Sequence, residues 1–156
     1  MNISIIGLGK LGAPLAACLA FKGYKVIGVD LNTHAVQAMN AGKSPVSETG
    51  LDDLILKVRD RISATSDYTT ALSHTQATFI IVPTPSDKHG GFSLKYVLGA
   101  IDAIGQALKN KPDYHLIVLT STVMPGATGS HVLPALESAS GKKGGLDFGL
   151  CSNPTF

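Results

Sequence analysis

Short apolar runs alternate along this chain with stretches in which apolar residues recur every three or four positions. The runs are rich in β-branched residues and predict strands at 3–6, 25–30, 77–82 and 115–120, with weaker strands at 62–65 and 146–151. The stretches between them predict helices at 13–21, 35–41, 51–58 and 96–108, and a short helix at 67–72. Strands that alternate with helices indicate right-handed crossovers and a mostly parallel sheet.

Several predicted strands are apolar at consecutive positions. Phe79-Ile80-Ile81-Val82 and Leu116-Ile117-Val118-Leu119 are two of them. A strand with one face in water would alternate between apolar and polar residues, so these strands are expected to be covered on both faces. The sequence therefore predicts a doubly wound α/β domain, with helices on both faces of the sheet.

Composition indicates one soluble domain and no partner that binds through strong charge. The chain has 156 residues, 44% of them hydrophobic, which is enough for a single core. Charged residues make up only 15% and the formal net charge is +2, which argues against nucleic acid or an anionic membrane surface as a partner. The first apolar run is too short for a signal peptide or a membrane span, so we expect a cytoplasmic protein.

Cysteine and histidine positions do not indicate a metal site. Cys18 and Cys151 lie far apart in sequence among apolar residues, and we expect buried free thiols. The five histidines are scattered without i, i+4 pairs, and we expect most of them at the surface. His131, in a predicted helix after Pro125, is a weak candidate for a general base.

The strongest chemical signal is Gly7-Leu8-Gly9-Lys10-Leu11-Gly12, between the first predicted strand and the first predicted helix. Glycines at this spacing permit a tight turn, close approach of a pyrophosphate and close contact of the helix with the sheet. The helix N-terminus then offers unpaired N–H groups to the phosphates, and Ala13, Ala16, Ala17 and Ala20 keep the helix slim. A glycine-rich turn without a ligand is the alternative. The P-loop pattern of nucleoside triphosphatases is absent.

Asp30 ends the second predicted strand about twenty residues after the glycine turn, as a dinucleotide-binding fingerprint requires. A carboxylate there accepts hydrogen bonds from the adenosine ribose and repels a 2′-phosphate, which favours NAD over NADP. The alternative is a solvated strand-end residue or a helix cap.

Unusual polar and proline sequences follow three other predicted strands. They are Val82-Pro83-Thr84-Pro85, Ser121-Thr122-Val123-Met124-Pro125-Gly126 and Ser152-Asn153-Pro154. Because ligands of doubly wound sheets bind beyond the carboxyl ends of the strands, we expect these segments to line one crevice. The hydroxyls of Thr84, Ser121 and Thr122 are candidate contacts for a cofactor or substrate, although such residues also serve as turn formers and helix caps.

Taken together, the motifs resemble the N-terminal NAD-binding domain of the UDP-glucose/GDP-mannose dehydrogenase family, over the whole chain. The resemblance rests on the glycine turn continued by Ala13-Pro14-Leu15-Ala16, on Gly28-Val29-Asp30, on Ser44-Pro45-Val46-Ser47-Glu48-Thr49-Gly50-Leu51, and on the three strand-end segments. The opening alone also fits the 6-phosphogluconate and 3-hydroxyisobutyrate dehydrogenases. The later motifs are more specific.

The resemblance implies a Rossmann-like domain of an enzyme that oxidises the C6 alcohol of a UDP- or GDP-sugar to a carboxylate while two NAD are reduced. It assigns Gly7, Gly9, Gly12, Asp30, Thr84 and Thr122 to the cofactor-binding pattern, and Thr122 also to organising a catalytic water. The complete predicted site adds the neighbours Leu8, Lys10, Leu11, Val82 and Pro83.

The family's nucleophilic cysteine and its lysine and asparagine partners belong to later domains. We therefore expect residues 1–156 to be a fragment that is inactive alone and binds its nucleotide sugar only together with central and C-terminal domains. Apolar surface at the edge where the sequence stops would favour a homodimer.

Three positions depart from the family pattern. Thr155 stands where the family has the glutamate of Asn-Pro-Glu-Phe, Thr49 replaces a proline, and Ala35 stands where a basic residue often neighbours the adenosine. Two other functions remain open at this stage: a dehydrogenase of small hydroxy acids with the same fold, and a regulatory module that binds NAD without chemistry.

Overall fold

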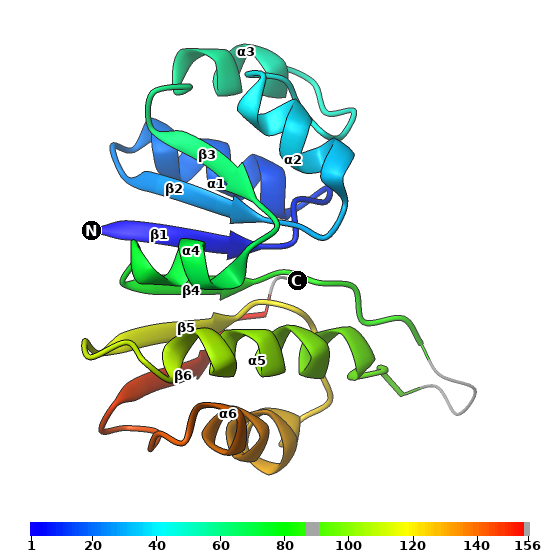
Figure 1. The fold of residues 1–156 in the computed structure, drawn as a ribbon. Coiled ribbons are helices and arrows are strands. Elements are labelled where there is room, and N and C mark those ends of the chain that lie inside the picture. Colours follow the sequence, from blue (N-terminus) through cyan, green and yellow to red (C-terminus); the bar gives the residue numbers. More distant parts are fainter. Residues whose placement is uncertain (87–90, 155–156) are drawn as a thin grey trace.

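Six parallel strands form one sheet in the order β3-β2-β1-β4-β5-β6 (Figure 1). The computed structural model describes residues 1–86 and 91–154. The strands are β1 (Asn2–Ile6), β2 (Lys25–Val29), β3 (Ile62–Thr65), β4 (Ala77–Ile80), β5 (His115–Leu119) and β6 (Phe148–Ser152). The helices are α1 (Gly12–Phe21), α2 (Thr33–Asn40), α3 (Leu51–Lys57), α4 (Tyr68–Ser73), α5 (Lys95–Leu108), the π-helical turn η1 (Thr128–Val132) and α6 (Leu133–Ser140).

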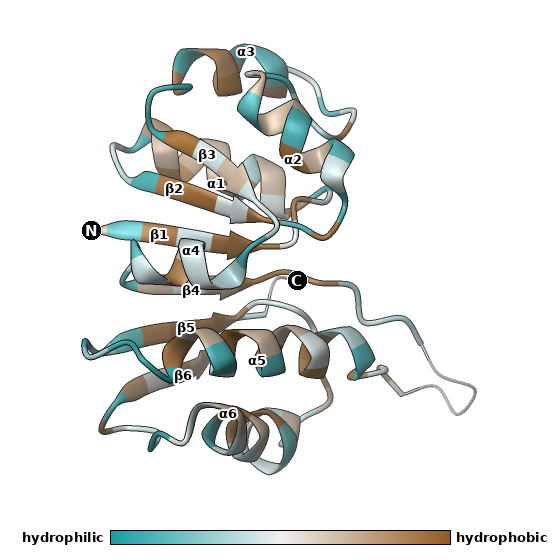
Figure 2. Ribbon diagram, in the orientation of Figure 1, coloured by the Kyte–Doolittle hydropathy of each residue, from teal (hydrophilic) through white to brown (hydrophobic). Residues whose placement is uncertain are grey.

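Helices cover both faces of the sheet, which confirms the doubly wound prediction. Successive residues of a strand point to opposite faces. In β1, Ile5 belongs to a core that joins α1, α2 and α3 to the sheet, whereas Ile6 belongs to a second core with α4, α5 and α6. Figure 1 shows α1 behind the sheet and α4 and α5 in front of it, and Figure 2 shows hydrophobic residues concentrated along the strands between these layers.

The strand order reverses at β1, which pairs with β2 on one side and with β4 on the other. The crossover helices leave β1 and β4 on opposite faces, so a crevice opens beyond the carboxyl ends of these two strands. The glycine turn follows β1 and Val82-Pro83-Thr84 follows β4. The fold therefore brings two of the predicted site segments together at the carboxyl ends of the strands.

The predicted strands at 25–30, 77–82 and 115–120 end one or two residues earlier in the structure, at Val29, Ile80 and Leu119. Of the residues beyond these points, Asp30 and Val82 line a cavity at this end of the sheet. Among residues 1–86 and 91–154, no helix is long and apolar enough to cross a membrane.

The prediction that both cysteines are buried is wrong, because both thiols are free and exposed. Cys18 lies on the outward side of α1, whose buried stripe consists of Gly12 and four alanines. Cys151 lies in β6, an edge strand of the sheet. An apolar sequence environment did not reveal which side of each element faces a neighbour.

His115 differs from the exposed His34, His74 and His131 because it is fully buried. His89 lies outside the described residues. The Nε2 atom of His115 is 2.7 Å from Oγ1 of Thr78, which is 2.6 Å from Oγ of Ser4. These three residues belong to β5, β4 and β1, so a chain of hydrogen bonds crosses the sheet near its amino-terminal edge. Burial, together with the charges of the nearby Lys111 and Lys142 ammonium groups, lowers the pKa of His115 to about 4.

We expect the stability of the fold to fall in mild acid because of His115. Its pKa is about 4 in the folded chain against an ordinary value of 6.5, so the unfolded chain binds the proton more tightly. The stabilisation is complete above pH 6.5 and is lost as the pH falls toward 4. The free energy of unfolding, measured by urea denaturation, should drop by about 2 kcal/mol between about pH 7 and pH 5.

A His115→Gln variant carries no titrating ring and should lose most of this drop, whatever its stability at neutral pH. The matched control is His74→Gln, which removes an exposed histidine and should leave the drop unchanged. A His115→Gln protein with the wild-type pH dependence would show that another group causes it.

Candidate cofactor site

The three glycines of the turn after β1 serve different purposes. Gly7 has a φ of +96°, and a Cβ atom there would collide with the carbonyl oxygen of Ile81. A Cβ atom on Gly12 would collide with the carbonyl oxygen of Gly7. At Gly9 an added Cβ would meet nothing within 4 Å. The chain itself therefore requires glycine at the first and third positions, whereas the second faces open space that a ligand can enter.

The first turn of α1 presents unpaired donors beside this open space. Leu11, the N-cap residue, makes no side-chain capping bond. The backbone N–H groups of Lys10, Leu11 and Gly12 donate to no other group in the described ranges. Lys10 and Leu11 are exposed. A helix N-terminus of this kind carries partial positive charge and can bind an anion such as a pyrophosphate.

Asp30 fixes the path of the glycine turn. Its Oδ2 atom accepts a hydrogen bond of 2.7 Å from the backbone N–H of Leu8, and its Oδ1 atom accepts one of 2.8 Å from the N–H of Asn32. The cap of α2 is Asn32, which accepts from the N–H of His34, so the helix-cap alternative for Asp30 is wrong. Each carboxylate oxygen keeps a lone pair that can accept from a ligand hydroxyl. The bond to Leu8 was not expected from the sequence.

Leu8 contributes its backbone to the turn, while its side chain is buried beneath it. Leu8 is 1% exposed, and a Cβ atom on Gly28 would lie 2.6 Å from its Cδ2 atom. Gly28 in β2 thus leaves room for Leu8 under the turn. The side chain anchors the turn in the core and points away from the crevice.

Ser121 does not offer its hydroxyl to a ligand, contrary to the expectation from its position. Its Oγ atom accepts a hydrogen bond of 2.9 Å from the N–H of Val82 and lies 2.8 Å from the carbonyl oxygen of Val82, to which it donates. The residue is 7% exposed. Ser121 therefore joins the end of β5 to the segment that leaves β4. Thr84 and Thr122 are half-buried, and their hydroxyls bond to no group in the described residues.

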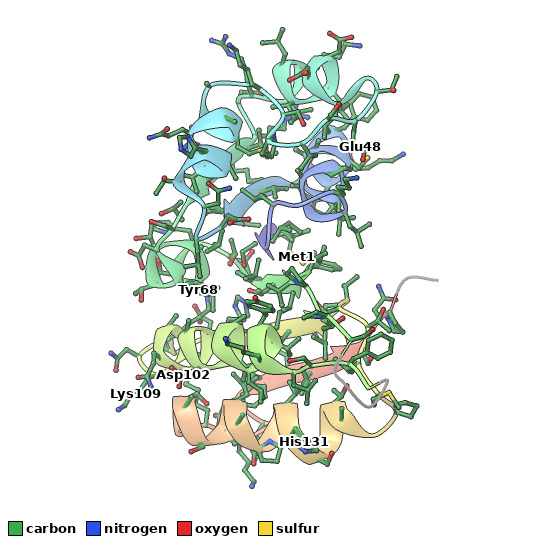
Figure 3. All side chains as sticks on the ribbon, turned by 90° about the vertical axis from the view of Figure 1, so that its right-hand side faces the viewer. Met1, Glu48, Tyr68, Asp102, Lys109 and His131 are labelled. Carbon is green, nitrogen blue, oxygen red and sulfur yellow. The ribbon has the colours of Figure 1, made fainter. Side chains whose placement is uncertain are left out.

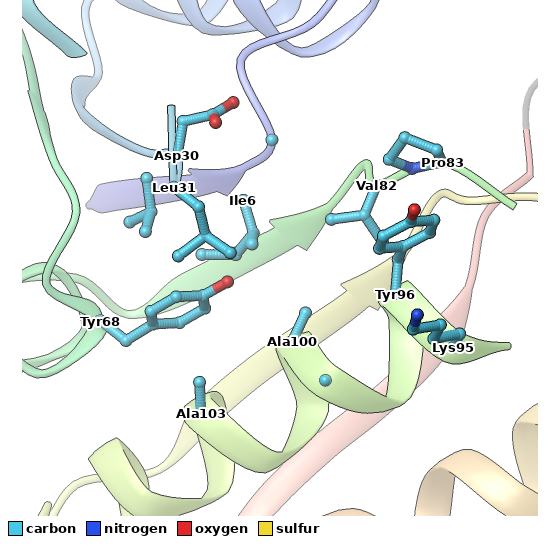
Figure 4. A pocket seen from close by; sticks show the side chains of 13 residues that line it. Ile6, Asp30, Leu31, Tyr68, Val82, Pro83, Lys95, Tyr96, Ala100 and Ala103 are labelled. Atoms are coloured by element: carbon cyan, nitrogen blue, oxygen red, sulfur yellow. The ribbon is translucent and has the colours of Figure 1, made fainter. Parts of the chain in front are cut away.

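A cavity of about 350 Å³ lies beside Asp30, between the ends of β1 and β2, helix α4 and the first two turns of α5 (Figure 4). Most of its wall is apolar, and polar groups come from Asp30, Tyr68, Lys95 and Tyr96. Small-molecule sites typically measure roughly 300–1,000 Å³, so this cavity has the size for one part of a dinucleotide. Its lining residues are Ile6, Gly7, Val29, Asp30, Leu31, Tyr68, Val82, Pro83, Lys95, Tyr96, Gly99, Ala100 and Ala103.

The cavity includes residues that sequence reasoning missed. Gly7, Asp30, Val82 and Pro83 were predicted site residues and line it. Tyr68, at the start of α4, and the amino-terminal half of α5 were not predicted to reach the crevice. No sequence motif identifies these residues as part of the site, because their position at the cavity depends on how α4 and α5 pack against each other.

His131 lies on the outer surface. It is exposed, and its Nδ1 atom is 2.7 Å from Oγ of the neighbouring Ser130. Figure 3, which looks onto the carboxyl ends of the strands, shows His131 on the lowest helix of the view, below Tyr68. Within the described ranges, no three residues of the types His, Cys, Asp and Glu are grouped so that they could hold a metal ion.

The three departures from the family pattern lie in different surroundings. Ala35 is buried in the first core, at 7% exposure, and supplies no charge to the crevice. Thr49 is exposed just before Gly50, the N-cap residue of α3. Thr155 lies outside the described residues.

Comparison with known proteins gives one consistent result. Residues 1–156 match the family model for the UDP-glucose/GDP-mannose dehydrogenase family, NAD binding domain. The chain is 43% identical to GDP-mannose 6-dehydrogenase of Pseudomonas aeruginosa, over 100% of this chain and 36% of that protein. It is 40% identical to UDP-glucose 6-dehydrogenase of Haloferax volcanii, again over 100% of this chain and 36% of the relative.

A crystal structure of a ternary complex of GDP-mannose dehydrogenase from Pseudomonas aeruginosa matches with a TM-score of 0.96 and 43% identity. The match covers 100% of this chain and 36% of that one. The chain thus spans about a third of the length of the relatives it matches. The similarity in sequence and in structure extends over the same residues.

Replacing Ser121 tests its role as the link between β5 and the segment after β4. Ser121→Ala removes both hydrogen bonds to Val82 and leaves a half-buried N–H group without its partner. We expect the free energy of unfolding to fall by about 1–3 kcal/mol in urea denaturation. Ser130→Ala removes an exposed serine hydroxyl and serves as the control. Equal stability of the Ser121→Ala and wild-type proteins would contradict the assigned role.

Proposed function

The chain belongs to the UDP-glucose/GDP-mannose dehydrogenase family as its NAD-binding domain, and we propose that the crevice beyond β1 and β4 is where it binds NAD. The observation that carries this proposal is the combination, at one edge, of open space at Gly9, unpaired N–H groups at the start of α1 and a carboxylate at the end of β2. These groups fit the pyrophosphate and the adenosine ribose of a dinucleotide.

Each part of the cofactor has a matching group in the crevice. The N–H groups of Lys10, Leu11 and Gly12 bind the pyrophosphate, which approaches the chain closely at Gly9. Asp30 accepts hydrogen bonds from the ribose hydroxyls, and the cavity beside it takes the adenine ring. The nicotinamide end then extends past Val82 and Pro83 toward Thr84 and Thr122. The free hydroxyls of Thr84 and Thr122 support this direction, because they are donors without a partner in the described residues.

We further propose that the complete protein oxidises the C6 alcohol of a nucleotide sugar to a carboxylate. Relatives that match this chain are named GDP-mannose 6-dehydrogenase and UDP-glucose 6-dehydrogenase. When bound, NAD would supply the hydride acceptor for the reacting carbon. Two such transfers remove four electrons, water supplies the second carboxylate oxygen, and two NAD are reduced for each sugar. Thr122 is proposed to help hold that water.

The comparisons favour this substrate class over small hydroxy acids, since the similarity to nucleotide-sugar dehydrogenases covers the whole chain.

The NAD site can be tested by calorimetric titration of this chain with NAD and, separately, NADP. We expect NAD to bind more tightly, because the charge of Asp30 repels a 2′-phosphate. Asp30→Asn should lower the affinity for NAD about tenfold or more, because hydrogen bonds to a charged acceptor are lost. It should also reduce the preference for NAD over NADP. Asp102→Asn removes an exposed carboxylate from α5 and is the control. An unchanged preference in Asp30→Asn would place the adenosine elsewhere.

The enzyme activity needs the full-length protein. We expect it to release two NADH for each GDP-mannose or UDP-glucose consumed, measured by NADH absorbance together with mass spectrometry of the uronate product. The present chain alone should bind NAD without turnover. A full-length protein that binds NAD and oxidises neither sugar would favour a regulatory module instead.

A further inference from the structure

Tyr68 begins α4 and reaches into the cavity beside Asp30. The carboxylate of Asp67 caps this helix by accepting a hydrogen bond of 2.9 Å from the N–H of Thr69. The cap fixes the first turn and therefore the direction of Tyr68. The ring is half-buried against the second core, and Figure 4 shows its hydroxyl directed toward the middle of the cavity.

The hydroxyl of Tyr68 has no hydrogen-bond partner in the described part of the chain, although a phenol can donate one bond and accept others. Placing such a group in a largely apolar space costs free energy unless a ligand or water completes its bonds. Burial raises the pKa of Tyr68, and the negative charge of Asp30 raises it further. The phenol is therefore neutral at neutral pH, and its oxygen can accept a hydrogen bond from a ligand N–H group.

The size and walls of the cavity suit a purine ring. Ile6, Leu31 and Ala100 supply apolar surface for its faces. With the ribose held at Asp30, the edge of the ring that points farthest from the sugar is the one that carries N1 and the 6-amino group. This edge is polar and, like the phenol, needs a partner when it leaves water.

We propose that Tyr68 determines specificity for the adenine base, because its hydroxyl oxygen accepts a hydrogen bond from the 6-amino group. The inference rests on the proposed NAD site and adds a residue to it. Tyr68 thus has two separable contributions: its ring forms part of the wall, and its hydroxyl recognises the base.

The test compares two ligands and three proteins by calorimetric titration. The ligands are NAD and an NAD analogue in which hydrogen replaces the 6-amino group of adenine. The proteins are wild type, Tyr68→Phe and the control Tyr24→Phe, which removes a phenol hydroxyl far from the cavity. Circular dichroism and thermal unfolding establish that each variant is folded. Tyr68→Phe keeps the ring, so packing against the second core is retained.

We expect wild type to bind NAD about three- to tenfold more tightly than the analogue. Tyr68→Phe should lower the affinity for NAD by a similar factor. This variant should bind the two ligands equally, because the amino group has lost its partner. Tyr24→Phe should behave as wild type.

Unchanged NAD affinity in Tyr68→Phe, or equal weakening of both ligands, would overturn the inference and leave the proposed NAD site intact. Failure of the folded wild-type chain to bind NAD would contradict the proposed site itself, and this inference with it.

Discussion

The hydrogen bond from the N–H of Leu8 to the carboxylate of Asp30 is the contact on which the crevice depends. A turn built around three glycines has little steric restriction of its own, so its path must be fixed from outside. The carboxylate does this from the end of β2, together with the bond of 2.8 Å from the N–H of Gly7 to the carbonyl of Val29. The group that shapes the turn is also the group proposed to bind the ribose, so positioning and recognition cannot be separated at this residue.

A second link stands on the other side of β1. The hydroxyl of Ser121 binds both backbone groups of Val82 and so fixes the segment after β4 relative to β5. Asp30 thus fixes the turn that follows β1, and Ser121 fixes the segment that follows β4. The strand order reverses between these two strands. Both links use side chains to pair backbone groups that the strands no longer pair, which is necessary wherever chains leave a parallel sheet.

The sequence predicts the features that depend on local rules. Consecutive apolar residues in the strands reflect burial on both faces, and only glycine fits at Gly7 and Gly12, so the sheet and the turn follow from the pattern. Features that depend on neighbours distant in sequence were missed. Ser121 looked like a ligand contact because its partner is a backbone group 39 residues away. Cys151 looked buried because no sequence pattern shows which strand lies at an edge. Tyr68 reaches the crevice only because α5 packs beside α4.

The two ends of the strands differ in how readily a ligand can reach their polar groups. Near the amino-terminal edge, the side chains of Ser4, Thr78 and His115 bond to one another across three strands. At the carboxyl edge, N–H groups of the first turn of α1 and the hydroxyls of Tyr68, Thr84 and Thr122 have no partner among the described residues. Lys10 and Leu11 are exposed and the three hydroxyl residues are half-buried, so water can reach these groups and a ligand can replace it. Tyr68 lines the cavity beside Asp30, and the other groups follow the carboxyl ends of β1, β4 and β5. This end of the sheet therefore offers hydrogen-bonding groups to a ligand with acceptors and hydroxyls, an argument that does not use the family resemblance.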